Sequence, residues 1–490
     1  MPRHPGQWVP RRARDDSWGL QHNRTRFASI RTPHAFGDRR IARDLITLAA
    51  PLERALLVGA PLKRSQDRHH VDEHLEELAR LADTAGAEVV GTLTQQLDRP
   101  HAATYLGKGK LDELRGRANA LDATLVVFDD ELTPAQGKNV EQTVGVRVMD
   151  RAELILDIFA TRARTNEAKL QVELAQLEYM LPRLTRMWTH LERTQGGIGT
   201  RGPGETQLET DRRLIGHRIR VLKERLADVE RSREVQRAGR RDSFRAALVG
   251  YTNAGKSSVL RGLSGSGDVF VEDRLFATLD PLTREVELGD GARALVTDTV
   301  GFVRKLPHQL VASFRATLEE TREADLLLHV IDASHPGWEE QRQVVEEVLG
   351  DVGASETPVV YVFNKVDALE PDAVEVLRDR AANEGQDAVF VSATTPGGLS
   401  PLCSALADRV HRARRTVEVR VPAADGRAVA AVHRAATVLS ERYDEDTVVM
   451  QAVFDRAALA RLAREMPQAF PREVAAAASA RSAPPQPALP

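Results

Sequence analysis

One short segment constrains the fold of this chain more than any other. An apolar strand pattern, Ala246 to Val249, leads directly into Gly250-Tyr-Thr-Asn-Ala-Gly-Lys-Ser257. The spacing Gly-x4-Gly-Lys-Ser between a strand and a helix is typical of a P-loop, whose glycines let backbone amides surround a phosphate at the positive end of the helix. We predict that Lys256 reaches the β- and γ-phosphates and that the Ser257 hydroxyl binds Mg²⁺. The segment therefore predicts an α/β domain with a parallel sheet that binds a nucleotide.

Three further segments, each at the end of a strand pattern, follow the P-loop in order. Asp298-Thr-Val-Gly301 offers Asp298 to Mg²⁺ and the Gly301 amide to the γ-phosphate. Asn364-Lys-Val-Asp367 offers a carboxylate, which we expect to be buried, to the N1 and N2 hydrogens of guanine, and adenine lacks that donor pair. Ser392 and Ala393 are expected to close on the guanine O6. Because open α/β sheets bind ligands at the carboxyl ends of their strands, this order predicts a GTP-hydrolysing domain.

The segment Phe276-Ala-Thr-Leu-Asp280 lies between the P-loop and Asp298. Thr278 is our candidate for the switch threonine that completes the Mg²⁺ ligands, with Thr283 as the competitor. The predicted metal ligands are therefore Ser257, Thr278 and Asp298, and the predicted catalytic residues are Lys256, Thr278 and Gly301. All residues predicted to contact the nucleotide lie on these segments: Gly250, Tyr251, Thr252, Asn253, Ala254, Gly255, Lys256, Ser257, Ser258, Phe276, Ala277, Thr278, Asp298, Gly301, Asn364, Lys365, Asp367, Ser392, Ala393 and Thr394.

Two residues of this site suggest unusual chemistry. The residue after Gly301 is Phe302, which has no donor or acceptor with which to orient an attacking water, so we predict slow turnover that a partner accelerates. Arg304 and Lys305 are candidates to stabilise transition-state charge, and are equally well explained as surface residues. The amide oxygen of Asn253 suggests a K⁺ site against the phosphates.

Length and composition limit the rest of the chain. With 490 residues the chain exceeds one hydrophobic core, and its single cysteine, Cys403, has no partner for an intramolecular disulfide. No signal peptide and no membrane-spanning run is visible, which predicts a cytoplasmic protein. We expect a multidomain α/β protein, and a monomer. The predicted divisions are a basic disordered leader (1–43), a small α/β domain (44–150), a helical hairpin (151–240), the P-loop GTPase domain (241–414), a small α+β domain (415–470) and a disordered tail (471–490).

The predicted hairpin rests on two leucine-rich heptad patterns. Leu170 to Leu184 and Ile215 to Val229 each repeat at steps of four and three, and can pack as antiparallel helices. Pro182 predicts a kink or an early helix end. The break between them, Gly196 to Gly204, is too rich in glycine to be helical, and its backbone can approach phosphates closely. We therefore predict contacts with RNA at Gly196, Gly197, Arg201, Gly202 and Gly204, the alternative being a plain connector. The arginine-rich leader can also contact nucleic acid, or it is a solvated disordered arm. At the other end of the chain we predict a helix near Arg427 to Tyr443 between two strands.

Further segments of the chain have a distinctive sequence: Thr104-Tyr-Leu-Gly-Lys-Gly-Lys110, Phe128-Asp-Asp-Glu-Leu132, Asp150-Arg-Ala-Glu-Leu-Ile-Leu-Asp-Ile-Phe159, Lys169-Leu-Gln-Val-Glu-Leu-Ala-Gln-Leu177 and Gly199-Thr-Arg-Gly-Pro-Gly-Glu-Thr-Gln-Leu-Glu209. Through these segments and the nucleotide motifs, residues 50–415 resemble the HflX family of ribosome-associated GTPases. The leader, the tail and most of the C-terminal unit lie outside it.

The resemblance implies a function. It implies that the protein binds the large ribosomal subunit, that the glycine-rich tip approaches ribosomal RNA, and that the GTP cycle splits stalled or idle ribosomes under stress. It also implies that the N-terminal domain accepts ATP; Gly107 to Lys110 could bind a phosphate, or simply open a helix that contacts RNA. A GTP-controlled assembly or checkpoint factor for the large subunit is the alternative function, because it would share the same core and the same RNA contacts.

Overall fold

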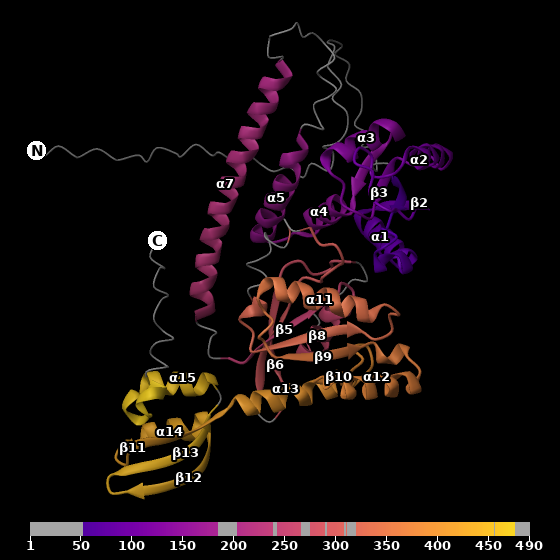
Figure 1. The fold of residues 1–490 in the computed structure, drawn as a ribbon. Coiled ribbons are helices and arrows are strands. Elements are labelled where there is room, and N and C mark those ends of the chain that lie inside the picture. Colours follow the sequence, from indigo (N-terminus) through magenta and orange to yellow (C-terminus); the bar gives the residue numbers. More distant parts are fainter. Residues whose placement is uncertain are drawn as a thin grey trace, which may run out of the picture. The chain divides into compact units, whose positions relative to one another are not determined.

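A computed structural model of the chain describes residues 52–184, 203–238, 243–265, 275–289, 292–307, 310, 320–454 and 456–475. The predicted leader, most of the glycine-rich break and most of the tail lie outside these residues. Within the described residues the α/β architecture predicted from the sequence is confirmed (Figure 1). Among the helices that the structure describes, none combines the length and apolarity that a membrane span needs.

The N-terminal domain, as the term is used below, comprises the elements from β1 to α4. Its four strands pair in parallel in the order β2-β1-β3-β4. Alternate strand residues face opposite sides, so that α1 and α4 pack on one face, and α2 and α3 on the other. The elements are β1 (Glu53–Gly59), α1 (Val71–Ala85), β2 (Ala87–Thr94), α2 (Lys108–Ala120), β3 (Leu125–Phe128), α3 (Pro134–Val144), β4 (Arg147–Asp150) and α4 (Arg151–Arg162).

Two helices follow the N-terminal domain. In α5 (Asn166–Met180), the side chain of Thr165 caps the first turn, and the helix gives way to a 3-10 turn, Leu181–Arg183, at the predicted Pro182 break. The long helix α7 (Pro203–Ala238) is tied to α5 by the ion pairs Arg218–Glu173 and Lys223–Glu178. The antiparallel hairpin itself stays a prediction.

The segment predicted to be non-helical, Gly196 to Gly204, is too long at its C-terminal end. Pro203 and Gly204 belong to the first turn of α7, whereas the sequence pattern placed both in a flexible tip. Proline is favoured at the first position of a helix, because the amide that it lacks would be unpaired there and its φ already suits the helix. The helix can therefore begin inside the glycine-rich segment.

The nucleotide domain, as the term is used below, comprises the elements from β5 to α13. Its strands have the order β10-β9-β8-β5-β7-β6, in which all neighbours are parallel except β6 and β7. Helices cover both faces, with α8 and α13 on one, and α11 and α12 on the other. The elements are β5 (Arg245–Gly250), α8 (Lys256–Ser264), β6 (Leu282–Glu287), β7 (Arg293–Asp298), β8 (Leu326–Asp332), α11 (Trp338–Val352), β9 (Val359–Asn364), α12 (Pro371–Asn383), β10 (Ala388–Phe390) and α13 (Ser400–Ala413).

The C-terminal part forms a small α+β unit. Its antiparallel sheet has the order β11-β13-β12, and α14 and α15 pack on one face of it (Figure 1). The helix predicted near Arg427 to Tyr443 is wrong in its second half, because Ala436 to Asp444 is a strand. This strand pairs antiparallel with its successor, and Glu445, with a φ of 53°, occupies the turn between them. The elements are β11 (Arg415–Pro422), α14 (Gly426–Ala435), β12 (Ala436–Asp444), β13 (Thr447–Phe454) and α15 (Arg456–Glu465).

Candidate active site

The P-loop joins β5 to α8 in a conformation that requires its glycines. Gly250 has a φ of 150°, and a Cβ there would lie 2.2 Å from the carbonyl oxygen of Val330 on the neighbouring strand. Gly255 has a φ of 96°, and a Cβ there would lie 2.3 Å from Nδ2 of Asn364. Neither position accepts another side chain without a shift of its neighbours, so the two glycines fix the path of the loop.

Lys256 begins α8 and is almost fully buried. Its Nζ donates to the carbonyl oxygens of Gly250 at 3.0 Å and Tyr251 at 2.8 Å. Burial lowers the pKa of Lys256 to about 8, although the nearby carboxylate of Asp298 opposes this shift. A buried ammonium group held only by carbonyl oxygens and one carboxylate across the site is well suited to receive a polyanion, whose charge would stabilise the protonated form.

Three oxygen-bearing side chains meet at the ends of the P-loop, the 276–280 segment and β7. The Ser257 hydroxyl donates to Oδ2 of Asp298 at 2.6 Å and lies 2.7 Å from the Thr278 hydroxyl. Burial raises the pKa of Asp298, and its Oδ1 is a buried oxygen without a hydrogen-bond partner among the described residues. A set of oxygen donors that includes a buried, unpartnered carboxylate oxygen fits a hard cation such as Mg²⁺. The structure thus brings Thr278, rather than Thr283, to Ser257; the Thr283 hydroxyl instead lies 2.9 Å from that of Thr297.

A small cavity of about 50 Å³ lies beside these residues. Its lining comes from the P-loop, the 276–278 segment and the end of β7: Thr252, Asn253, Gly255, Lys256, Ser257, Ser258, Phe276, Ala277, Thr278, Thr299 and Gly301. Gly301 is pressed against the P-loop, since a Cβ on it would lie 2.8 Å from Cα of Thr252 and 3.1 Å from Nζ of Lys256. From the P-loop motif we predict that the phosphates of a bound nucleotide lie in this cavity.

The predicted guanine-binding residues lie at the ends of β9 and β10. Nδ2 of Asn364 donates to the carbonyl of Ala254 at 2.9 Å, and its Oδ1 accepts from the amide of Ala393 at 3.1 Å. Nζ of Lys365 donates to the carbonyl of Asn253 at 3.0 Å. Asn364 and Lys365 therefore hold the P-loop and the base-binding segments in one arrangement.

Asp367 lies in the 3-10 turn after β9. It is exposed here, which corrects the expectation of a buried carboxylate. Hydrogen bonding by Ser392 and, less strongly, Thr394 holds its pKa below the usual value, although partial desolvation opposes this. Asp367 is therefore ionised at neutral pH, which is the form that accepts two hydrogen bonds from guanine.

Phe276 lines the small cavity, and its ring packs away from the polar residues of the site. Its ring is buried against Phe159 of α4, with the ring centroids 4.5 Å apart and the planes at 87°. Only its backbone joins the site, because the Phe276 amide donates to the Thr252 hydroxyl at 3.1 Å. The side chain thus anchors the 276–280 segment to the N-terminal domain.

Phe302 is also buried, and its backbone closes the site. Its amide donates to the carbonyl of Gly250 at 3.1 Å, and its carbonyl accepts from the amide of Thr252 at 2.7 Å. The ring packs into the hydrophobic core with 3% of its surface exposed. A side chain without polar atoms in this position cannot orient a water molecule.

Sequence reasoning missed a polar network that joins the nucleotide domain to the N-terminal domain. The carboxylate of Asp129, which follows β3, accepts from Arg151 at 2.8 Å, from Arg304 at 3.3 Å and from Lys305 at 2.9 Å. Lys305 also donates to Asp130 at 2.5 Å. Arg304 and Lys305, which sequence reasoning left as either transition-state stabilisers or surface residues, therefore lie against the N-terminal domain.

The same network extends to the P-loop. The hydroxyl of Tyr251 donates to Glu77 of α1 and accepts from the amide of Arg304 at 2.9 Å. Arg151 pairs with Glu77 and donates through Nε to the carbonyl of Arg304 at 3.0 Å. Burial lowers the pKa of Arg151 to about 9, so its guanidinium remains charged at neutral pH. The only hint in the sequence was that Asp129 and Arg151 lie in motifs without another explanation.

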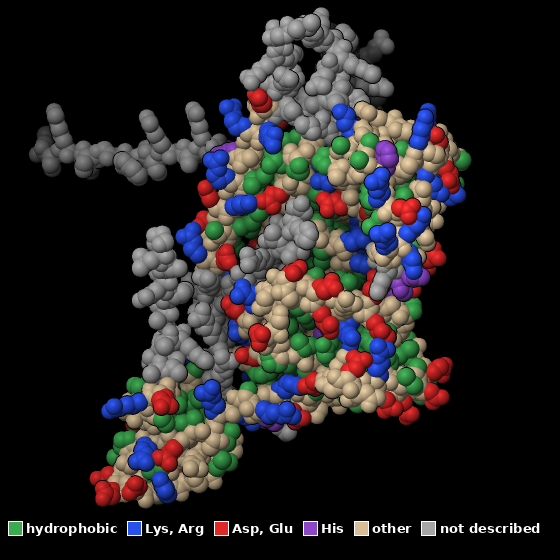
Figure 2. All heavy atoms as spheres, in the orientation of Figure 1, with side chains coloured by type: hydrophobic (Ala, Val, Ile, Leu, Met, Phe, Trp, Pro, Cys, Tyr) green, Lys and Arg blue, Asp and Glu red, His purple; other side chains and the backbone are tan. Residues whose placement is uncertain are grey.

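The predicted RNA contacts are largely outside the described residues. Gly196, Gly197, Arg201 and Gly202 lie in the segment that the structure leaves undescribed, and Gly204 lies on α7. On the face drawn in Figure 2, basic and acidic side chains of the described residues are interspersed. The RNA prediction therefore depends on the segment around residue 200 rather than on a basic patch visible on that face.

The fold and the site together define a P-loop GTPase. Models of three protein families match successive parts of the chain: "GTP-binding GTPase N-terminal" over residues 72–160, "GTP-binding GTPase Middle Region" over residues 162–240 and "50S ribosome-binding GTPase" over residues 245–365. The chain belongs to the HflX family of GTPases, and it hydrolyses GTP.

Similar proteins align along most of the chain. GTPase HflX of Caldanaerobacter subterraneus is 47% identical over 83% of this chain and 92% of its own length. GTPase HflX of Magnetococcus marinus is 47% identical over 86% of this chain and 97% of its own length. GTPase HflX of Escherichia coli is 44% identical over 80% of this chain and 91% of its own length. Among solved structures, a GTP-binding protein from Sulfolobus solfataricus in complex with GDP aligns with 73% of this chain and 99% of its own, at 24% identity and a TM-score of 0.40.

Proposed function

We propose that this GTPase binds the large ribosomal subunit and uses GTP binding and hydrolysis to split stalled or idle ribosomes into subunits, chiefly under stress. The observation that carries the proposal is the match of residues 245–365 to the family of 50S ribosome-binding GTPases, in a chain whose relatives are HflX GTPases. The predicted glycine-rich tip near residue 200 is the segment that would contact ribosomal RNA.

Mg²⁺ would be held by Ser257, Thr278 and Asp298. Its charge would neutralise the β- and γ-phosphate oxygens during phosphoryl transfer. Lys256 would bind the same oxygens, and the Gly301 amide would donate to the γ-phosphate. Positioning and charge stabilisation are the main contributions that a protein makes to this reaction, because the transition state spreads negative charge over the transferred group.

The water that attacks the γ-phosphate needs a positioning group that Phe302 does not supply. Buried in the core, Phe302 leaves only the backbone of the loop, a rearranged switch segment or a ribosomal partner for this role. We therefore expect slow hydrolysis by the isolated protein and acceleration by ribosomes. Rapid hydrolysis by the pure protein, unchanged by ribosomes, would contradict this part of the proposal.

Sedimentation of purified intact ribosomes tests the proposed activity. With the protein and GTP, the ribosome peak should decrease and the two subunit peaks should increase, whereas GDP should leave the ribosomes intact. A Lys256→Ala chain provides the matched control, because it lacks the phosphate-binding ammonium group. If the protein instead bound only immature large subunits and left intact ribosomes unchanged, the assembly role would replace the splitting role.

The proposal also includes ATP binding, a K⁺ site and the place where the protein acts. ATP binding at Gly107 to Lys110 would use the start of α2, where Gly107 occupies the N-cap position. K⁺ at Asn253 would add charge beside the phosphates. A monomer acting in the cytoplasm would meet its ribosomal partner directly.

A further inference from the structure

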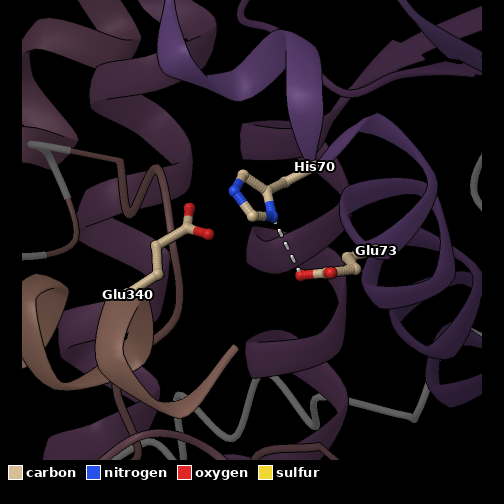
Figure 3. Close-up of side chains that lie close together, drawn as sticks. All are labelled: His70, Glu73 and Glu340. Atoms are coloured by element: carbon tan, nitrogen blue, oxygen red, sulfur yellow. Dashed lines mark ion pairs between the residues drawn. The ribbon is translucent and has the colours of Figure 1, made fainter. Parts of the chain in front are cut away.

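A histidine and two glutamates form a cluster beside the nucleotide site, and neither the GTPase activity nor the ribosome proposal uses it. Glu73 lies in the first turn of α1, His70 directly precedes that helix, and Glu340 lies in the first turn of α11. One ligand atom of each residue lies within 4.8 Å of the others. Figure 3 shows the imidazole and the two carboxylates pointing toward a common space.

We propose that this cluster binds a divalent transition-metal cation of the Zn²⁺ class, through His70, Glu73 and Glu340. The cation would connect α1 of the N-terminal domain to α11 of the nucleotide domain. The proposal concerns a second metal site, distinct from the Mg²⁺ ligands Ser257, Thr278 and Asp298.

The spacing of the ligand atoms suits such a cation. Zn²⁺ binds imidazole nitrogen and carboxylate oxygen at about 2.0–2.2 Å, which places tetrahedral ligands about 3.4 Å apart. Nδ1 of His70 and Oε2 of Glu73 are already 3.4 Å apart. Glu340 has only to close a gap that is within reach of a side-chain rotation, because none of the ligand atoms is more than 4.8 Å from another.

Surrounding residues prepare the site without being ligands. His74, which is 7% exposed, lies with Nε2 at 3.2 Å from Oε1 of Glu340 and is therefore a positioning residue for that carboxylate. Gly337 leaves room for Glu73, because a Cβ on Gly337 would lie 3.1 Å from Oε2 of that residue.

The environment is negative and open to solvent. A cavity of about 170 Å³ that adjoins the cluster is lined by five carboxylates and two guanidinium groups; two of the carboxylates, Glu77 and Asp332, also pair with Arg151 and Lys365, which leaves a small excess of negative charge that favours a cation. The charged residues that line the cavity are Glu73, Glu76, Glu77, Asp332, Glu340, Arg80 and Arg304. The side chains of His70, Glu73 and Glu340 are each 36–46% exposed, which leaves an entry path for the ion. Imidazole coordination favours Zn²⁺ over Mg²⁺, which prefers oxygen ligands and retains its waters.

The binding of Zn²⁺ to the full-length protein tests this proposal. The protein is loaded with GDP and saturating Mg²⁺, so that the Asp298 site is filled, and it carries Cys403→Ser, so that the only thiol cannot compete. Titration against a chromophoric chelator should show one tightly bound Zn²⁺ equivalent. His70→Asn or Glu340→Gln should weaken it by more than tenfold, and His74→Asn by about 10- to 100-fold as an outer partner.

A matched control and an independent readout make the test decisive. His433→Asn removes a histidine that forms a similar pair with Glu441, at 3.0 Å, but has no third ligand within the part of the chain that the structure describes, and it should leave Zn²⁺ binding unchanged. Unchanged GDP affinity shows that each variant is folded. X-ray absorption of the Zn²⁺-loaded protein should show imidazole and oxygen ligands at about 2.0–2.2 Å. No stoichiometric binding, equal binding by His70→Asn and Glu340→Gln, or a spectrum without imidazole would overturn the proposal.

Discussion

The buried guanidinium of Arg151 provides the sharpest test of how the N-terminal domain is joined to the nucleotide domain. We consider Arg151→Met, which keeps much of the side-chain volume and removes the charge and all its donors. With 1% of its surface exposed, Arg151 donates to Asp129 at 2.8 Å and to the Arg304 carbonyl at 3.0 Å, and it pairs with Glu77. The substitution therefore leaves two carboxylates without a shared cation.

The magnitude follows from the charges of the network. Three cations face three anions in the wild-type network, so the substitution leaves a net negative charge in a largely buried region. The cations are Arg151, Arg304 and Lys305, and the anions are Glu77, Asp129 and Asp130. Removing one partner of a buried ion pair costs about 3–5 kcal/mol. We expect the N-terminal domain to lose about that much stability.

Hydrogen exchange read on β3 and α4 measures this loss locally, without requiring that the whole chain unfold in two states. A loss of about 3–5 kcal/mol corresponds to exchange that is about 150- to 5,000-fold faster at amides that exchange by opening of the domain. Arg293→Met is the matched control, because Arg293 forms ion pairs with Glu285 and Glu287 at the surface. Such an exposed pair contributes only about 0–1 kcal/mol.

A double-mutant cycle with Asp129→Asn separates the ion pair from the loss of packing. If Arg151 and Asp129 interact as their 2.8 Å contact indicates, the double variant should be less destabilised than the sum of the single variants by about 1–3 kcal/mol. Exchange in Arg151→Met that matches the Arg293→Met control, or strict additivity in the cycle, would refute the role given to this network.

Three predictions concern the nucleotide site itself. Burial lowers the pKa of Lys256 in the nucleotide-free protein to about 8, and the triphosphate should raise it again. At pH 8.5 GTP binding should therefore be accompanied by net proton uptake, measured by calorimetry in two buffers of different ionisation enthalpy, and zero uptake would contradict the assignment. Gly255→Ala should weaken GTP binding by more than tenfold in a nucleotide titration, because its Cβ would meet Asn364, whereas Gly265→Ala, with a φ of 61° but open space around it, should bind GTP normally. If Asn253 holds K⁺, hydrolysis should be faster in K⁺ than in Na⁺ at equal ionic strength, and equal rates would eliminate that site.

The nucleotide site could be predicted because the sequence encodes it in short segments. Each segment follows a strand, and a parallel sheet gathers the carboxyl ends of its strands at one edge. This geometry brings Ser257 within 2.6 Å of Asp298 although 41 positions separate them. The two-domain network could not be predicted in this way, because Arg151 and Arg304 are 153 positions apart, on different domains, and no local pattern marks their contact.

Two local features, one a failed helix prediction and the other the packing of a predicted site residue, are explained by tertiary structure. The segment Ala436 to Asp444 directly follows a helix in the sequence but becomes a strand, because β13 is available to pair with it on both sides of a bulge at Leu439. Phe276 lies in a nucleotide-binding segment, yet its ring finds a better environment against Phe159 than in a polar site. In both cases a partner from another element decides the conformation, and a single sequence does not name that partner.

Contacts with the N-terminal domain also limit how far two segments of the nucleotide site can move without that domain. Gly301 contacts the P-loop, and Arg304, only three residues later, is held by Asp129 of the N-terminal domain. A chain of three residues spans at most about 11 Å, so it has little slack to absorb a displacement of Gly301. The 276–280 segment is attached to the same domain through Phe159, and to the start of α5, which follows that domain, through the hydrogen bond from Thr165 to Asp280. A movement of either segment on loss of the γ-phosphate would therefore strain its contacts with the N-terminal domain.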